Sequence, residues 1–374
     1  MPSQQGQLQA SYLEYLQSSG LDRAFADHAP KTPPDPYAHG AFDPKIAQAD
    51  IRWLEQSRGY ATWETVGTEP QGVYLARLAT VRQRKGPFLG DRLPHLQPVL
   101  DGQARALFDA AHRLGVSFPF DIFVGLYPTG EFNAHVQPVA GGALLLVNAG
   151  LMDLLFCVLK ANLAASGSDQ DPPLLKDRQT AMVLAETFNA YLYGDGSLLA
   201  WPLPRLDSNR ESFLGFVLRA GELFVIAHEL GHIACGHVRL PQRSGAQAEV
   251  QLTPETELEA DAFAVDLLVR GSGFAEDERP AAFLAGGILN ILSIAFEVSA
   301  LADRFRLEQA SAGTHPALTE RWARLETLLK QRIPTGKVEK RGEMFRGWLT
   351  IKYLAPIEEW FDRVNEEMTR PSKY

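Results

Sequence analysis

The chain has 374 residues, of which 45% are hydrophobic and 22% are charged, and its formal net charge is -9. This is the composition of an ordinary soluble globular protein, long enough for a large core in one large domain or two smaller ones. The acidic balance and the lack of a basic stripe argue against nucleic acid as a partner.

The first 92 residues are predicted to form an accessory region of helices and a linker. The N-terminus is polar and lacks the charged start and apolar stretch of a secretory signal. Residues 7–27 and 46–57 have helical character, and five prolines within residues 30–44 indicate a linker or an arm between them. Residues 59–90 show no clear period and stay unassigned.

Residues 93–335 are predicted to form the main domain, a mainly helical α+β unit with one small sheet. Apolar residues at helical spacing predict a helix over 99–114 that stops at Gly115. A Gly141-Gly142 pair predicts the turn before the last of three short strands. The strands are expected at 121–127, 134–137 and 143–147, and further helices at 149–163, 176–194, 210–238, 254–270, 278–302 and 316–332.

Two other segments complete the predicted organisation. Residues 239–253 are polar and are expected to be mobile. Residues 336–374 are predicted to form a C-terminal tail with a helix at 356–369.

Two apolar stretches are long enough to be considered as membrane spans, residues 143–165 and 281–302. Polar or charged residues interrupt both, including Lys160 in the first and Glu297 in the second. We therefore expect buried core helices and no transmembrane segment. The two cysteines are too few for a disulfide framework or a four-cysteine zinc site, and reduced thiols suit a cytoplasmic location.

The sequence His-Glu-x-x-His occurs on an apolar helical background at residues 224–232. His228 and His232 are four residues apart, so both imidazoles leave the same helix face and can share one cation. Glu229 is offset from His228 by about 100° around the helix, beside the metal, which suits a general base for a metal-activated water. The alternative is a surface helix with two unrelated histidines.

A third zinc ligand is predicted on the next helix. Thr253 is a suitable N-cap and Pro254 a suitable first helical residue. Glu257 and Asp261 share one face of this helix, whereas Glu259 points away by about 200°. We assign Glu257 to Zn²⁺ and Asp261 to orienting a histidine, because ligating imidazoles donate their other N–H to an acid. The alternative is a solvated acidic helix start.

These residues resemble a gluzincin metallopeptidase. Further segments are similar to the CAAX prenyl protease and HtpX-type peptidase family. They are Asn133-Ala134, the glycine pair, strand and Gly-Leu start within residues 141–151, the histidine at His237, and Thr314-His315-Pro316 with Arg321. Residues 257–268 are also similar to the ImmA/IrrE-type proteases.

The resemblance implies a zincin-like metalloprotease core with a small edge-exposed sheet. It implies that strand 143–147 is an edge strand that holds extended peptide, so the expected substrate-binding residues are Asn133, Ala143, Leu144 and Leu145. It also implies that His315 and Arg321 lie near the site and stabilise the oxyanion. The alternatives are a loop histidine for His315 and a structural or surface histidine for His237.

Three residues each have two possible roles. Cys235 is a redox or inhibitory thiol, or a buried inert cysteine. Tyr191 and Tyr193 are oxyanion donors in place of His315, or part of an aromatic core face.

The sequence thus predicts a zinc-dependent endopeptidase that cuts protein or peptide substrates, with Glu229 as general base. It does not indicate an oligomeric state. One alternative is a zinc-stabilised peptide-binding or scaffold protein with little turnover. Another is a latent protease held inactive by residues 1–90 or 336–374. An aminopeptidase is disfavoured because the chain has no Gly-x-Met-Glu-Asn anchor for a free amine.

Overall fold

The structure is a computed structural model, and it describes part of the chain. The described residues are 4–19, 93–167, 173–193, 206–241, 248–271, 278–304, 317–333, and the single positions 357, 359 and 362. The predicted linker, the helix at 46–57 and most of the helix at 356–369 lie outside these residues.

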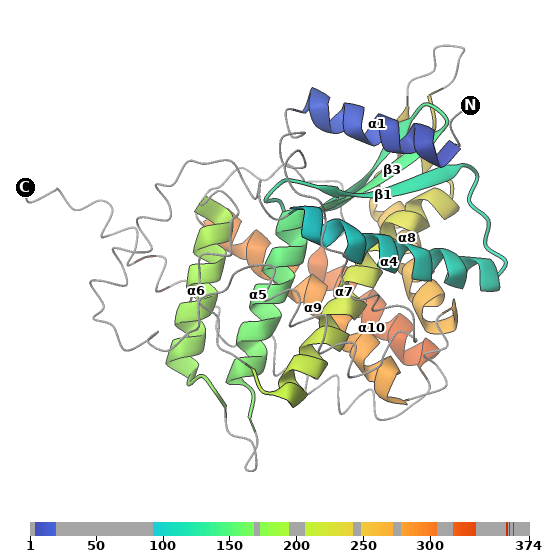
Figure 1. The fold of residues 1–374 in the computed structure, drawn as a ribbon. Helices are drawn as coiled ribbons and strands as arrows, with labels where there is room; N and C mark the ends of the chain where they lie inside the picture. Colours follow the sequence, from blue (N-terminus) through green and yellow to red (C-terminus); the bar gives the residue numbers. More distant parts are fainter. Residues whose placement is uncertain are drawn as a thin grey trace, which may run out of the picture.

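The described part is mainly helical with a small sheet, which confirms the predicted α+β class (Figure 1). The elements in chain order are α1 (Gln4–Ser18), α4 (Leu93–Arg113), β1 (Asp121–Tyr127), β2 (Ala134–Val139), β3 (Gly142–Asn148), α5 (Ala149–Ala165), α6 (Asp177–Tyr193), α7 (Ser208–Ala234), β4 (Val238–Arg239), β5 (Glu249–Val250), α8 (Pro254–Gly271), α9 (Glu278–Arg304) and α10 (Leu318–Arg332).

The strands and most helices fall where the sequence patterns predict them, with differences at the ends. Helix α4 begins six residues earlier than expected and includes Pro98. Helix α7 ends at Ala234, four residues earlier than expected, and Val238 belongs to β4. The segment 239–253, expected to be mobile, contains the rest of β4 and all of β5, and Val238 is opposite Val250 in this short pair. Gly141, with φ of 88°, makes the turn between β2 and β3, as predicted.

The three-stranded sheet has the order β1-β3-β2, with β1 parallel and β2 antiparallel to β3. Alternate residues of β3 face two different layers. Leu144 and Leu146 pack against Tyr12 and Leu16 of α1, whereas Leu145 and its alternate neighbours join the helical core. The sheet therefore lies between α1 and the main helical layer (Figure 1).

The prediction that residues 143–147 form an edge strand is wrong. Leu145 pairs with Val124 of β1 on one side and with Val136 of β2 on the other. The physical reason is visible in the sequence, because an unbroken apolar run suits a strand buried on both faces and paired on both edges. Strand β2, with its alternating burial, is an outer strand of this sheet.

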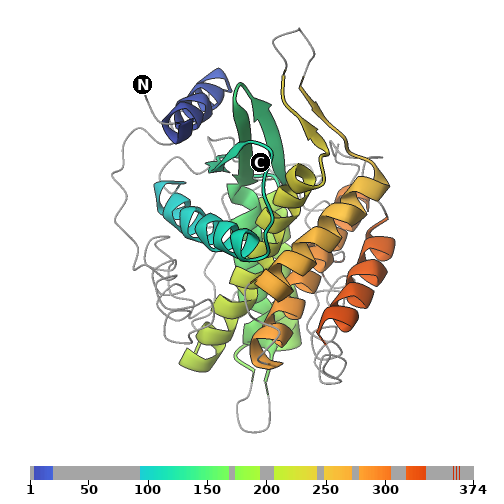
Figure 2. The same cartoon turned by 90° about the vertical axis from the view of Figure 1, so that its right-hand side faces the viewer.

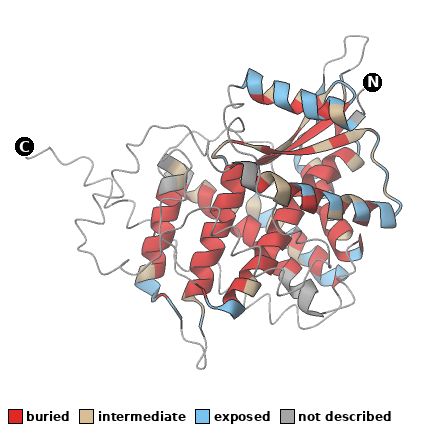
Figure 3. Cartoon of the chain, viewed as in Figure 1, coloured by how far each residue is buried: buried red, intermediate tan, exposed pale blue. Residues whose placement is uncertain are grey.

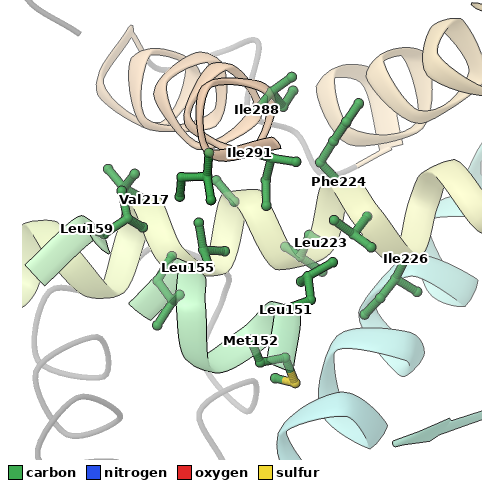
Figure 4. Close-up of a cluster of buried hydrophobic side chains, with 14 of the residues drawn as sticks. Leu151, Met152, Leu155, Leu159, Val217, Leu223, Phe224, Ile226, Ile288 and Ile291 are labelled. Carbon is green, nitrogen blue, oxygen red and sulfur yellow. The ribbon is translucent and has the colours of Figure 1, made fainter. Parts of the chain in front are cut away.

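Helix α7 is the centre of the helical layer and contacts α5, α8 and α9. Apolar side chains from α5, α7 and α9 interdigitate along it (Figure 4). Gly287 of α9 allows a close approach, since a Cβ atom there would lie 2.6 Å from the backbone nitrogen of Gly221. Buried residues are concentrated in these helices and the sheet, while the outer surfaces of α1 and α4 are exposed (Figure 3).

Helix α9 is the one described helix that is long and apolar enough to cross a membrane, over Leu284–Leu301. However, 78% of that window is buried inside the protein. Neighbouring helices cover most of its apolar surface, as for a helix in the core of a folded protein.

Candidate metal centre

The site begins with the way in which α7 is anchored. Asp207 caps the helix, since its side chain accepts hydrogen bonds from the backbone N–H groups of Asn209 and Arg210, both at 3.0 Å. The helix then runs through the core for 27 residues. Its last two turns carry His228, Glu229 and His232, all buried.

Helix α8 brings the acidic residues to α7. Thr253 and Thr256 cap its start with reciprocal hydrogen bonds between backbone N–H and hydroxyl groups, at 2.9 and 3.3 Å. Gly231 lets the two helices touch, because a Cβ atom there would lie 2.9 Å from the Cα of Ala260. This close approach places Glu257 opposite the histidines. Figure 2 shows α8, in gold, with α10, in red-orange, beside it.

Three side chains, His228, His232 and Glu257, form a triangle of donor groups. His228 Nε2 and His232 Nε2 are 3.3 Å apart. Each lies 3.4 Å from a different carboxylate oxygen of Glu257, Oε2 for His228 and Oε1 for His232. One donor atom from each residue can be chosen so that all three lie within 4.8 Å of one another, so the group is positioned to bind a metal ion. Ligands of a tetrahedral zinc ion at about 2.0–2.1 Å are separated by about 3.3–3.4 Å, and an ion held by three protein ligands has a fourth position for another ligand.

A second layer of polar groups holds this triangle from behind. His228 Nδ1 lies 2.8 Å from Asp261 Oδ1, so its N–H donates to a fully buried carboxylate. Arg321 of α10 donates to both oxygens of Asp261, at 2.8 and 2.7 Å, and its Nη1 lies 3.8 Å from Glu257. The guanidinium therefore joins α10 to the carboxylates of α8.

The charges of this cluster shift the pKa values of Asp261 and His228 in directions that favour an ionised carboxylate beside a positive charge, whereas burial lowers the pKa of His232. Burial alone would raise the pKa of Asp261, but Arg321 and His228 outweigh it and lower that pKa to about 2. Burial would lower the pKa of His228, but its contacts with Asp261 and Glu257 raise it to about 9. The surroundings of His228 thus favour a positive charge at this position, as a cation would supply.

Glu229 follows His228 directly on α7 and is 9% exposed. Burial tends to lower the pKa of Arg321, but the charges of Asp261, Glu257 and Glu229 together raise it. The negative charge of Glu229 is therefore felt at the metal centre. The carboxylate is thus part of the electrostatic environment of the triangle.

A chain of hydrogen bonds connects His232 of the donor triangle to His237 and then to Glu259. His232 Nδ1 lies 3.1 Å from His237 Nδ1, and His237 Nε2 lies 3.0 Å from Glu259. His237 is buried and is neither a surface histidine nor remote from the site. Sequence reasoning set Glu259 aside because it points away from Glu257, but that direction is where His237 lies.

The interpretation of Cys235 as a buried cysteine is wrong, because its side chain is exposed. The residue caps the end of α7, where the chain turns through Gly236 with φ of 81°. Partial desolvation by the surrounding chain, followed by the charge of Glu259, raises the pKa of the exposed Cys235 thiol.

The other predicted site residues are spread more widely. His315 lies outside the described residues. Asn133 is exposed ahead of β2, and its side chain accepts from the backbone N–H of Ala134 at 2.9 Å. The three residues expected to bind substrate from β3 are fully buried in the central strand, namely Ala143, Leu144 and Leu145.

The two tyrosines can be placed only in part. The Tyr191 hydroxyl accepts a hydrogen bond from the backbone N–H of Phe132, and its ring packs against the core. This favours the structural interpretation of Tyr191. The side chain of Tyr193 lies outside the described residues.

The architecture and the donor triangle define a mainly helical protein with a candidate metal centre. Residues 212–332 match the family model of Peptidase U49, which supports a peptidase. The matched segment contains α8, α9, α10 and most of α7, and so includes the donor triangle and Arg321. Searches of curated proteins and of solved structures gave no significant match. The CAAX prenyl protease and ImmA/IrrE resemblances therefore stay predictions.

Proposed function

We propose that this chain is a zinc-dependent endopeptidase. The observation that carries the proposal is the triangle of His228, His232 and Glu257. The two Nε2 atoms are 3.3 Å apart, each is 3.4 Å from one of the two Glu257 oxygens, and these contacts are close to the ligand spacing of a tetrahedral zinc ion. Support also comes from the match of this segment to a peptidase family.

Zinc, when bound by these three side chains, would act as a Lewis acid toward a peptide carbonyl and a water molecule. The chain's own residues supply the remaining chemistry. Glu229 is placed beside the donors, where its carboxylate takes a proton from the attacking water and delivers it to the leaving amine. The carboxylate ends the cycle ionised, ready for the next water.

Asp261 and Arg321 act as positioning residues in this proposal. Asp261 fixes the His228 tautomer by accepting its Nδ1–H, which directs the Nε2 lone pair into the triangle. Arg321 donates to both oxygens of Asp261, and in this proposal its guanidinium holds that carboxylate in position. The oxyanion role expected of Arg321 stays a prediction. An oxyanion role for His315 stays a prediction.

The substrate is proposed to lie along β2. This strand is at one edge of the three-stranded sheet. It contacts α7, which carries the two histidines, and the β4–β5 pair that follows α7 along the chain. Main-chain hydrogen bonds to an edge strand need no particular side-chain sequence, which suits a protease that accepts an extended peptide.

The test is the Glu229→Gln variant compared with wild type and with Glu255→Gln. Glu255 is an exposed glutamate at the start of α8 and serves as the matched control. We expect Glu229→Gln to retain zinc in metal analysis and to lose about 10²–10⁴-fold in the rate of casein cleavage. The control should keep both properties, and His228→Ala should lose zinc.

Cleavage by Glu229→Gln at the native rate would refute the assignment of the general base. Zinc binding by a wild-type protein that cleaves no unfolded substrate would favour the peptide-binding or scaffold alternative. Activity that appears only after removal of residues 1–92 or 336–374 would favour a latent protease.

A further inference from the structure

Two residues just after α7 and one on α8 form a second group of metal-type donors. The Cys235 thiol, a ring nitrogen of His237 and a carboxylate oxygen of Glu259 lie within 4.8 Å of one another. We name these three residues the outer cluster. Cys235 and Glu259 are exposed and His237 is buried, so the cluster opens to solvent on one side.

Local backbone structure holds the outer cluster in place. The N–H of His237 donates to the carbonyl of His232 at 2.9 Å, and the N–H of Gly236 donates to that of Ile233 at 3.2 Å. With the positive φ of Gly236, this is the motif by which helices reverse their chain at the C-terminus. It folds His237 back beside the end of α7. The N–H of Gln251, just after β5, donates to the His237 carbonyl at 2.8 Å and also holds this residue in place.

The three donors are those of a zinc site. A thiolate, an imidazole and a carboxylate select borderline cations such as Zn²⁺ or Co²⁺ over Mg²⁺ and Ca²⁺, which prefer oxygen ligands. Tetrahedral zinc with one thiolate needs its ligand atoms about 3.3–3.7 Å apart. Because Cys235 and Glu259 are exposed, rotation of their side chains can close the cluster to that spacing.

We infer that Cys235, His237 and Glu259 form an outer site for a second zinc-type divalent cation, and that a cation in this site inhibits the peptidase. The binding stands on the outer cluster alone. The inhibition rests on the proposed function.

The coupling between the two sites follows from where the imidazole protons are. When His232 uses Nε2 as a metal donor, its Nδ1 carries a proton and donates to His237 Nδ1, 3.1 Å away. The proton of a neutral His237 is then on Nε2 and is donated to Glu259, at 3.0 Å. A cation in the outer cluster needs the Nε2 lone pair, so the proton moves to Nδ1 and opposes the N–H of His232. The His232 ring loses its acceptor, and its support for the inner cation is weakened.

The binding test uses Co²⁺ as the probe, on the full chain stripped of metal. A cysteine thiolate that binds Co²⁺ gives a charge-transfer band that histidine and carboxylate ligands lack, and the inner triangle contains no thiol. We expect two Co²⁺ ions per chain and a thiolate band in wild type, and loss of both the band and one equivalent in Cys235→Ser. The variant Cys157→Ala, which alters the buried cysteine of α5, should keep the band.

Absence of the band in wild type, or its persistence in both Cys235→Ser and Cys235→Ala, would overturn the outer site. The same titration in His228→Ala reports on the outer cluster with the inner triangle disrupted, so its result does not depend on peptidase activity. One equivalent and a retained band are expected there.

The inhibition test adds Zn²⁺ beyond one equivalent and follows peptide cleavage, with each protein scaled to its own rate at one equivalent. We expect the zinc concentration for half inhibition to rise at least about tenfold in Cys235→Ser and in Glu259→Gln, as for loss of one metal ligand, but not in Glu255→Gln. Equal inhibition of all four proteins would overturn the coupling while leaving the binding result to stand. Failure of the proposed function would show instead as no cleavage at any zinc concentration.

Discussion

At the scale of single residues, two arginine–aspartate pairs join α10 to α8 in very different surroundings. Arg321 and Asp261 are mostly or fully buried behind the donor triangle, with side chains 14% and 0% exposed. Arg332 and Asp266 lie on the surface, with side chains 41% and 34% exposed. Both pairs connect the same two helices, so a difference between them in zinc binding reports on their distance from the metal centre.

We predict that Arg321→Lys weakens zinc binding about 10–100-fold, the range for loss of a partner behind a metal ligand. A lysine is a single point charge and cannot donate to both oxygens of Asp261 as the guanidinium does. The measurement is competition for zinc against a chelator of known affinity.

The matched control is Arg332→Lys. An exposed ion pair contributes little because water screens it, so this variant should keep its zinc affinity and nearly all of its stability. Equal zinc affinities in the two variants would show that Arg321 does not support the metal site.

At the scale of elements, the site depends on how closely α7 and α8 approach. Gly231 lies between the two histidine positions and faces Ala260, at the level of Glu257 and Asp261. An alanine in mid-helix is usually more stable than glycine by about 1 kcal/mol, so only tertiary contact explains a cost here.

We predict that Gly231→Ala destabilises the protein by about 1–3 kcal/mol, because its Cβ would lie 2.9 Å from backbone atoms of Ala260 and must push α8 away. The displacement moves Glu257 from the histidines, so zinc affinity should fall as well. Chemical denaturation and a zinc titration measure the two effects.

Gly287→Ala provides the contrast for that experiment. It crowds the contact between α9 and α7, since its Cβ would lie 2.6 Å from Ala220 Cβ, but none of the three donors is on α9. It should lower stability while the folded protein keeps its zinc affinity. An unchanged zinc affinity in Gly231→Ala would contradict the role given to this helix contact.

At the scale of the whole molecule, stability depends on a helix that is apolar but carries a buried acid. Glu297 of α9 is 0% exposed, and neither of its carboxylate oxygens has a hydrogen-bond partner in the structure as described. Burial raises its pKa well above the ordinary value. The carboxyl therefore keeps its proton in the folded protein at a pH where the unfolded chain has lost it.

The sign of the pH dependence follows directly. Stability from this group is greatest below the ordinary carboxyl pKa and falls as pH rises toward the raised value. Glutamine does not titrate, so Glu297→Gln should stabilise the protein more at about pH 8 than at about pH 5, by about 1–3 kcal/mol at the higher pH. Unfolding at both values, with the exposed Glu320→Gln as control, tests this. A gain that is the same at the two values would contradict the burial of an ionisable group.

Much of the local structure could be predicted because it depends on neighbours along the chain. The four-residue spacing of His228 and His232 places them on one helix face whatever surrounds the helix. The same reasoning gives Glu257 and Asp261 a common face, and it gives Thr253 its place at the start of α8. The predicted strands also follow from short apolar segments and from the turn at Gly141.

Contacts between distant residues could not be obtained in this way. The position of β3 at the centre of the sheet depends on pairing with two strands at once, and the resemblance pointed to an edge instead. The contact of His237 with Glu259 joins residues 22 positions apart. The contact of Arg321 with Asp261 joins residues 60 positions apart.

The sequence by itself therefore determined the helices and strands and the pairs of donors that share a helix face, because periodicity and capping act within a few residues. Only the tertiary structure decided that α7 and α8 meet at Gly231, that the Glu257 carboxylate lies 3.4 Å from both imidazoles, and that His237 turns toward Glu259. These features depend on how whole helices pack, and packing is set by the shape and burial of all the side chains between them.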